Sequence, residues 1–278
     1  MTKNIDNEGL KSIIANYDIF YIDLWGVVHN GIKPHTKAIE ALKEITKVNK
    51  EYVLLTNAPR PKKSVQLILE KMGIHEEIRK KVYSSGEAAL NYLKKNYLYK
   101  KFYHIGASRD FDLFLDFKKN QVKKIHECEY LLCTGLFEDK NLEYYKNEDL
   151  EYYKKLFKEH IDKKMICTNP DLIVDRGNKR ELCAGSVALV FKKMGGEVIY
   201  FGKPYPEVYN QSINNKGKKA LSIGDNLNTD IKGANLLNYD SLLISNGVHK
   251  NEIKEEGIDV VSRRYKAIVN FIQTELKW

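Results

Sequence analysis

The chain has 278 residues, a formal net charge of +9, 43% hydrophobic residues and 30% charged residues. No apolar run approaches the roughly 20 residues that span a bilayer, and the start MTKNIDNEGLKS lacks the basic and apolar stretches of a signal peptide. We therefore expect a cytoplasmic protein. Because the lysines alternate with Glu and Asp instead of gathering on one stripe, we expect neither membrane nor nucleic-acid partners.

Seven short apolar or aromatic runs end in a polar residue, Gly or Asn, which is typical of a buried strand followed by a loop. In chain order these runs cover residues 18–23, 51–57, 101–107, 129–135, 164–169, 196–203 and 219–226. Stretches with helical spacing lie between them, at residues 34–47, 60–73, 85–96, 184–196 and 230–237. Strand, loop and helix repeated in this order predict an α/β fold with parallel sheets and right-handed crossovers.

Two further features carry little chemistry. Residues 137–160 are rich in Lys, Tyr and Glu, which predicts a solvated loop followed by an exposed helix. The four cysteines show no spacing typical of metal ligands, so we expect reduced core thiols. Cys183, in ELCAGS, is a conceivable nucleophile, but no base can be assigned to it and a core thiol is the preferred interpretation.

Polar side chains stand where several predicted strands end. Asp23 follows IFYI, Thr56 ends YVLLT, Lys203 follows YFG, and Asp225 and Asp230 straddle the turn in IGDNLNTD. Taken singly, an Asp in such a place is more often a turn or cap residue. The carboxyl ends of parallel strands meet at one edge, however, and phosphoryl transfer needs a nucleophile, a hydroxyl, a cation and carboxylates for a hard metal ion. The combination therefore indicates a phosphoryl-transfer site that binds Mg²⁺.

Longer motifs around these residues resemble those of the haloacid dehalogenase (HAD) superfamily. The similarity is to the hydrolases of class IIA, the group of the NagD phosphatases, the 4-nitrophenyl phosphatases and the pyridoxal phosphate phosphatases. It rests on IDLWGVVHNGIKPHTKAIEAL, LLTNAPRPKKSV, TNPDLIV with LCAGSVALVF, YFGKPYPEVY, and SIGDNLNTDIKGANLLNYDSLLISNGV. The resemblance implies a Rossmann-like parallel-sheet core with an inserted α/β cap of the C2 type. The predicted core is residues 1–81 and 185–278, and the predicted cap is residues 82–184.

The resemblance also implies roles for individual residues. Asp23 matches the nucleophile, Thr56 the phosphate-binding hydroxyl and Lys203 the lysine that neutralises the phosphoryl charge. The implied Mg²⁺ ligands are Asp23, the backbone carbonyl of Trp25, Asp225 and Asp230. The implied substrate-binding residues are Asn57, Asn169, Asp171 and Asn226. For the TNPD loop that holds Asn169 and Asp171, a simple turn is as good an interpretation as a substrate contact.

One position departs from the family. Two residues after the nucleophile the family carries a second Asp, which protonates the leaving alkoxide and then activates water, whereas this chain has Trp25. An indole has one very weakly acidic N–H and no basic atom, so a general acid and base usually worth roughly 10² to 10⁴ in rate is missing. His29 is a conceivable stand-in, although a loop histidine is more often a surface residue.

Three hypotheses follow. The first is a Mg²⁺-dependent phosphatase acting on a small phosphorylated metabolite, whose leaving group is already acidic or receives its proton from the substrate or the cap. The second is a non-catalytic protein that binds or senses a phosphoryl ligand. The third is dehalogenase-like alkyl transfer to Asp23, which needs no acid, but which would leave Asp225 and Asp230 without a purpose. The sequence names no substrate and leaves a homodimer open.

Overall fold

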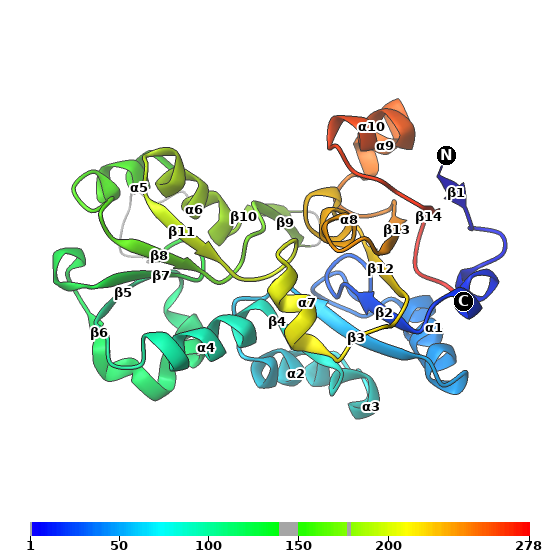
Figure 1. The fold of residues 1–278 in the computed structure, drawn as a ribbon, viewed down its shortest axis with the longest axis horizontal. Coiled ribbons are helices and arrows are strands. Elements are labelled where there is room, and N and C mark those ends of the chain that lie inside the picture. Colours follow the sequence, from blue (N-terminus) through cyan, green and yellow to red (C-terminus); the bar gives the residue numbers. More distant parts are fainter. Residues whose placement is uncertain (1, 139–149, 177–178) are drawn as a thin grey trace.

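The computed structural model describes residues 2–138, 150–176 and 179–278 of the chain. Two parallel sheets lie at opposite ends of the elongated molecule, and a two-stranded antiparallel hairpin lies between them (Figure 1). None of the helices in these described ranges combines the length and the apolar character that crossing a bilayer requires. The mostly parallel α/β architecture predicted from the sequence is confirmed.

The larger sheet has seven parallel strands. The first and the last strand along the chain are neighbours in it and pair with each other. In spatial order the strands are β1 (Lys3–Asn4), β14 (Phe271–Gln273), β13 (Asp240–Ile244), β12 (Ala220–Gly224), β2 (Ile19–Ile22), β3 (Glu51–Thr56) and β4 (Val82–Ser84). Helices cover both of its faces. They are α1 (Thr36–Lys47), α2 (Lys62–Lys71), α3 (Glu76–Arg79), α4 (Ser85–Asn96), α7 (Pro206–Ser212), α8 (Lys232–Leu236), α9 (Lys250–Glu256) and α10 (Ile258–Arg264).

Burial on both faces explains why the central strands are continuous apolar runs. In β2, all four residues of IFYI are buried. Phe20 and Ile22 pack in the cluster that includes α1 and α2, whereas Ile19 and Tyr21 pack in the cluster that includes α4 and α7. The strand therefore packs between two layers of helices, and this packing fixes the position of its carboxyl end.

The smaller sheet has five parallel strands. In spatial order they are β11 (Glu197–Tyr200), β8 (Lys164–Cys167), β7 (Tyr130–Cys133), β5 (Phe102–Ile105) and β6 (Gln121–Val122). Helices α5 (Leu150–Phe157) and α6 (Ala184–Lys193) pack on one face, and α4 packs on the other. The hairpin consists of β9 (Ile173–Arg176) and β10 (Lys179–Leu182), and it joins β8 to α6.

The seven predicted strands are all observed, each within the residues expected for it. The predicted junctions at residues 82 and 185 do not coincide with the sheets. Strand β4 begins at Val82 but hydrogen-bonds to β3 in the larger sheet, whereas α6 and β11 belong to the smaller sheet. The chain therefore enters the smaller sheet through α4 and leaves it after β11. Apolar composition identifies a buried strand but not the sheet that the strand joins.

The predicted exposed helix in residues 137–160 also needs correction. Helix α5 begins at Leu150, and its residues Tyr153 and Phe157 are buried against α6 and the smaller sheet. The aromatic residues of this segment are therefore partly core residues. Residues 139–149, where the solvated loop was predicted, lie outside the described residues.

Candidate active site

A pocket of about 610 Å³ lies where the carboxyl ends of both sheets meet. From the larger sheet it is lined by the residues that follow β2, β3 and β12, and from the smaller sheet by the loops after β5, β7 and β8. All ten residues that the sequence assigned to the site line it: Asp23, Trp25, Thr56, Asn57, Asn169, Asp171, Lys203, Asp225, Asn226 and Asp230. Their convergence agrees with the rule that ligands of open α/β sheets bind at the strand carboxyl ends.

Lys203 lies at the centre of the charged residues in this pocket. Its Nζ donates to Asp23 Oδ1 at 2.5 Å and to Asp230 Oδ1 at 2.6 Å, and only 3% of the lysine is exposed. Burial opposes the ammonium charge, but Asp23 and Asp230 outweigh it and raise the pKa of Lys203. The lysine is therefore a permanent cation between two carboxylates, the arrangement that a phosphoryl oxygen entering the pocket would meet.

Asp225 is buried beside this pair and receives less compensation. Its Oδ2 accepts one hydrogen bond, from the Val248 N–H at 3.1 Å. Burial, together with repulsion from Asp23 and Asp230, raises the pKa of Asp225 well above its ordinary value. A carboxyl group in such surroundings favours either a proton or a metal cation.

Two glycines lack a side chain where the carboxyl groups of Asp225 and Asp230 approach the backbone. A Cβ at Gly26, whose φ is +83°, would lie 2.2 Å from Asp225 Oδ2, and a Cβ at Gly224 would lie 2.0 Å from Asp230 Cγ. The glycine that follows Trp25 thus permits both a left-handed turn and a close approach of the backbone to a carboxylate.

The three carboxylates fit a hard divalent cation. Asp23, Asp225 and Asp230 each offer an oxygen, and these oxygens lie within 4.8 Å of one another. Three buried carboxylates carry three negative charges when ionised, and the Lys203 ammonium offsets one. The remainder matches the charge of Mg²⁺, which prefers carboxylate and water oxygens. The backbone carbonyl of Trp25 remains a predicted further ligand.

Thr56 and Asn57 form the next part of the wall. Thr56 ends β3, is buried, and accepts the Ala58 N–H at 3.2 Å through its Oγ1. The Asn57 side chain accepts from the Lys203 N–H at 2.7 Å and donates to the Lys203 carbonyl at 3.0 Å. It also donates to Asp171 Oδ1 at 2.9 Å. Asn57 therefore fixes the backbone around Lys203 and links it to the loop after β8. A contact between Asn57 and a substrate stays a prediction of the sequence.

Asn169 and Asn226 both make local hydrogen bonds. Asn169 Oδ1 accepts the Asp171 N–H at 2.9 Å, so the TNPD loop contains the turn that the sequence left as one alternative. Asn226 caps the helical turn Leu227–Ile231, because its Oδ1 accepts the Asn228 N–H at 2.9 Å. Its own N–H donates to Asp230 Oδ2 at 3.2 Å. Both side chains therefore stabilise local backbone structure, and their contacts with a substrate remain predictions.

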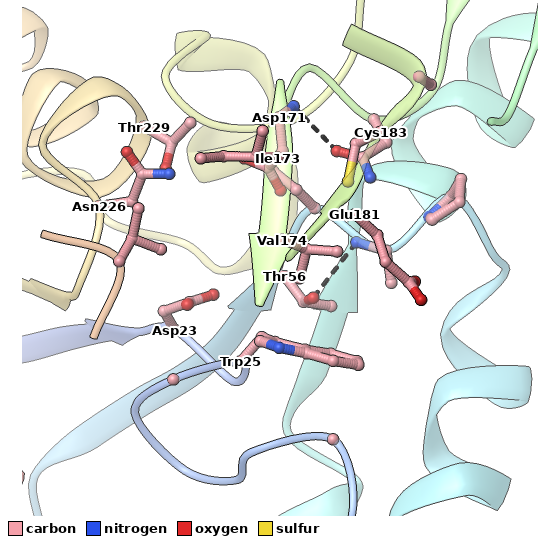
Figure 2. Close-up of a pocket in the computed structure, with 18 of the residues that line it drawn as sticks. Asp23, Trp25, Thr56, Asp171, Ile173, Val174, Glu181, Cys183, Asn226 and Thr229 are labelled. Carbon is pink, nitrogen blue, oxygen red and sulfur yellow. Dashed lines mark hydrogen bonds between the residues drawn. The ribbon is translucent and has the colours of Figure 1, made fainter. Parts of the chain in front are cut away.

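Trp25 lies on the same wall as Asp23, with its indole extending along the pocket (Figure 2). Its ring packs edge to face with His29, at a centroid distance of 5.2 Å. A Cβ at Gly31 would lie 2.5 Å from the indole Cζ2, so the ring fills the space above that glycine. The residue at the family's acid position is thus a half-buried indole that packs on His29 and Gly31 and lines the pocket.

The hypothesis that His29 replaces the missing acid is not supported. His29 is buried, its Nδ1 accepts the Gly31 N–H at 3.0 Å, and it is not among the residues that line the pocket. Burial lowers the pKa of His29 to about 4, so the ring is neutral near pH 7. Cys183 does line the pocket, but burial raises the pKa of its thiol. It is therefore a protonated wall residue, in agreement with the preferred interpretation.

Sequence reasoning missed an ion pair that joins the two sheets. Arg60, in the loop after β3, donates through its Nη2 to Asp110 Oδ1 at 2.9 Å, and Asp110 lies in the segment after β5. Both residues line the pocket. The sequence does place Arg60 four residues after Thr56, close to a predicted strand end. Its partner lies 50 residues away along the chain, however, and no local sequence pattern predicts such a pair.

Comparisons with known proteins agree with this architecture. A family model described as haloacid dehalogenase-like hydrolase matches residues 20–117, and a HAD-hydrolase-like model matches residues 200–269. The 4-nitrophenylphosphatase of Schizosaccharomyces pombe is 28% identical over 284 residues, which cover 92% of this chain and 93% of that protein. The dihydroxyacetone phosphatase of Corynebacterium glutamicum is 32% identical over 89 residues, or 31% of this chain and 32% of that protein.

Among solved structures, a hydrolase of the haloacid dehalogenase-like family from Brucella suis 1330 has a TM-score of 0.80 and 29% identity, covering 96% of this chain and 98% of that one. Two family models, a near full-length relative and this shared fold agree with the motifs. The chain is therefore similar to the haloacid dehalogenase-like hydrolases in its motifs, in its fold and over nearly its whole length.

Proposed function

We propose that the protein is a Mg²⁺-dependent phosphatase that hydrolyses a small phosphorylated metabolite through an aspartyl-phosphate intermediate on Asp23. The observation that carries the proposal is the buried Lys203 ammonium between Asp23 and Asp230, with Asp225 beside them, at the edge of a parallel sheet. Such an arrangement binds a phosphoryl group and the cation that accompanies it. The curated relatives with phosphatase names support the same class of enzyme, phosphoric monoester hydrolase.

The proposed reaction uses the chain's own groups in a simple order. Asp23 attacks phosphorus as a carboxylate, while Lys203 and Thr56 hold phosphoryl oxygens. Burial raises the pKa of Asp23 to about 7, although Lys203 lowers it. Bound Mg²⁺ would supply further positive charge to the carboxylates and the phosphoryl group. Water then hydrolyses the aspartyl phosphate and restores Asp23.

Trp25 restricts this chemistry on the side of the leaving group. Because the indole cannot protonate an alkoxide, the leaving oxygen must either be weakly basic or receive a proton from another residue. The same feature favours the second candidate, a protein that binds a phosphoryl ligand without turning it over. A dehalogenase-like reaction is disfavoured, because it would leave Asp225 and Asp230 without a cation to hold.

Several further predictions belong with this function. We propose that the smaller sheet, its helices and the hairpin act as the cap that closes over the substrate. The cytoplasmic location, the lack of nucleic-acid and membrane partners, and an open possibility of a homodimer stay predictions of the sequence.

One assay separates the two candidates. Wild-type protein should release 4-nitrophenolate from 4-nitrophenyl phosphate with added Mg²⁺ and not with a chelator. Asp23→Asn should lower the rate by about 10³-fold or more, because it removes the nucleophile and keeps the shape. The matched control is Asp18→Asn, at the opposite end of the same strand, where the carboxylate accepts the Lys219 N–H at the surface. Mg²⁺-dependent binding without turnover would instead identify the phosphoryl-ligand binding protein.

A further inference from the structure

The loop between β8 and β9 holds the carboxyl group of Asp171 firmly in the pocket. The Asp171 N–H donates to Asn169 Oδ1 at 2.9 Å, and its carbonyl accepts the Gly185 N–H at 3.1 Å. Its Oδ1 accepts from Asn57 Nδ2 at 2.9 Å. A Cβ at Gly185 would lie 2.5 Å from the Asp171 carbonyl oxygen, so α6 approaches this loop as closely as a backbone can. The side chain therefore has a fixed position instead of a mobile one.

Asp171 also lines the pocket across from Asp23. In an in-line displacement the leaving oxygen is opposite the attacking oxygen of Asp23. Figure 2 shows Asp23 on the loop after β2 and Asp171 across the pocket, on the loop that leads into β9. Through Asn57, the neighbour of Thr56, Asp171 is tied directly to the proposed phosphoryl site.

Burial is the main influence that favours a protonated carboxyl group at Asp171. Burial raises its pKa to about 6, and Asp230 acts in the same direction, whereas Lys203 and the Asn57 hydrogen bond lower it. Asp23 and the Cys183 thiol also face this carboxyl group, and neither adds positive charge. A phosphoryl dianion bound beside an ionised Asp171 would be repelled, so substrate binding itself favours the proton on Asp171.

We propose that Asp171 donates the proton to the leaving oxygen, in place of the carboxyl group that is missing at position 25. The inference rests on the phosphatase function proposed above. In the first step the Asp23 oxygen bonds to phosphorus, the bond from phosphorus to the leaving oxygen breaks, and that oxygen takes the Asp171 proton. In the second step a water oxygen bonds to phosphorus and the bond to Asp23 breaks. The water proton returns to Asp171, so both carboxyl groups regain their starting states.

The test compares leaving groups of different basicity. For Asp171→Asn, kcat/KM is measured on 4-nitrophenyl phosphate, phenyl phosphate and β-glycerol phosphate with saturating Mg²⁺. We expect a loss below about 3-fold for nitrophenolate, which leaves unaided, an intermediate loss for phenolate, and roughly 10² to 10⁴ for the alkoxide. Asp171→Glu, which keeps an acid on a longer stem, should retain part of the alkyl activity.

Asp110→Asn is the matched control. Asp110 lines the same pocket from the smaller sheet and is held by Arg60 and by Thr134 Oγ1 at 3.0 Å, so its loss weakens a link between the sheets. It should lower kcat/KM by one common factor for all three substrates. The same uniform loss in Asp171→Asn, or no loss at all, would overturn the inference, because Asp171 would then only hold the loop. Failure of the wild type to hydrolyse 4-nitrophenyl phosphate would instead count against the proposed function.

Discussion

The two parallel sheets end at the same pocket but bring different side chains to it. The larger sheet concentrates charge, since Asp23, Asp225 and Asp230 are buried together around Lys203. The charged side chains from the smaller sheet are mostly in ion pairs: Asp110 with Arg60 of the larger sheet, and Glu138 with Arg109. Leu136, after β7, and Ile173 and Val174 of the hairpin line the same side of the pocket.

This difference suggests a division of labour. Excess buried charge is costly for a fold unless a ligand uses it, so the edge of the larger sheet is built for a phosphoryl group and a metal ion. Paired charges and hydrocarbon suit the recognition of the remainder of a substrate. Asp171 differs from Asp110, because its carboxyl group is held by the neutral amide of Asn57. The predictions below test this contrast in order of decreasing effect.

The largest effect should come from Lys203→Met. It removes the cation between two carboxylates that are almost fully buried, so the metal-free variant should lose about 3–5 kcal/mol of unfolding free energy. Turnover of 4-nitrophenyl phosphate should fall by about 10³-fold, because the charge that meets the phosphoryl group is gone. Urea unfolding at neutral pH and steady-state kinetics measure the two effects.

The matched control for that variant is Lys218→Met. Lys218 pairs with Glu51 at the opposite end of the larger sheet, where Glu51 is exposed and Lys218 is partly exposed. An exposed pair contributes roughly 0–1 kcal/mol, so this substitution should change stability little. If the two lysine variants were equally stable, the excess buried charge at the pocket would not be a real feature of the protein.

The three central strands β12, β2 and β3 of the larger sheet, and the site at their ends, were predictable from sequence for one physical reason. Buried parallel strands must be continuous apolar runs, and the polar residue that ends each run must lie at the shared carboxyl edge. Asp23, Thr56 and Asp225 all follow this rule. The strands β1, β4, β13 and β14 of the same sheet were not among the predicted runs.

The other failures depend on long-range packing. The sheet that a strand joins, and therefore the junctions at β4 and β11, follows from pairing partners far along the chain. The burial of His29 and the pair between Arg60 and Asp110 are likewise set by tertiary contacts. A motif finds residues that share a sheet edge, but it does not find a contact between two different sheets.

Exchange of Trp25 tests whether the proton donor can be moved from one sheet to the other. In the Asp171→Asn background, Trp25→Asp should raise kcat/KM for β-glycerol phosphate about 10-fold and leave 4-nitrophenyl phosphate nearly unchanged. The expected gain is below that of a well-placed acid, because the pocket is shaped around an indole that packs on Gly31 and His29. Trp25→Asn in the same background removes the same ring without adding an acid. A gain of equal size in both variants would show that space, and not a proton, was limiting.

The smallest effect is a pH-dependent response to Mg²⁺. Asp23 has a pKa of about 7 in the folded metal-free protein, against an ordinary value of 3.8. A raised pKa means that the stability from this group is present below pH 3.8 and is lost as the pH rises through 7. Mg²⁺ binds the ionised carboxylates, so it should raise Tm by roughly 5 °C at about pH 8 and much less at about pH 5.5. Calorimetry with Asp225→Asn as control checks this, since an equal Mg²⁺ response in the variant would exclude Asp225 as a ligand.

The central claim is that Asp23 itself carries the phosphoryl group during turnover. The direct measurement is rapid acid quenching of the protein during hydrolysis of 4-nitrophenyl phosphate with Mg²⁺, followed by digestion and mass spectrometry. We expect a phosphoryl group on the peptide that contains Asp23, formed within one turnover and absent when Mg²⁺ is chelated or when Asp23 is changed to Asn. Steady hydrolysis with no phosphorylated peptide, or with the phosphoryl group on another residue, would contradict the account.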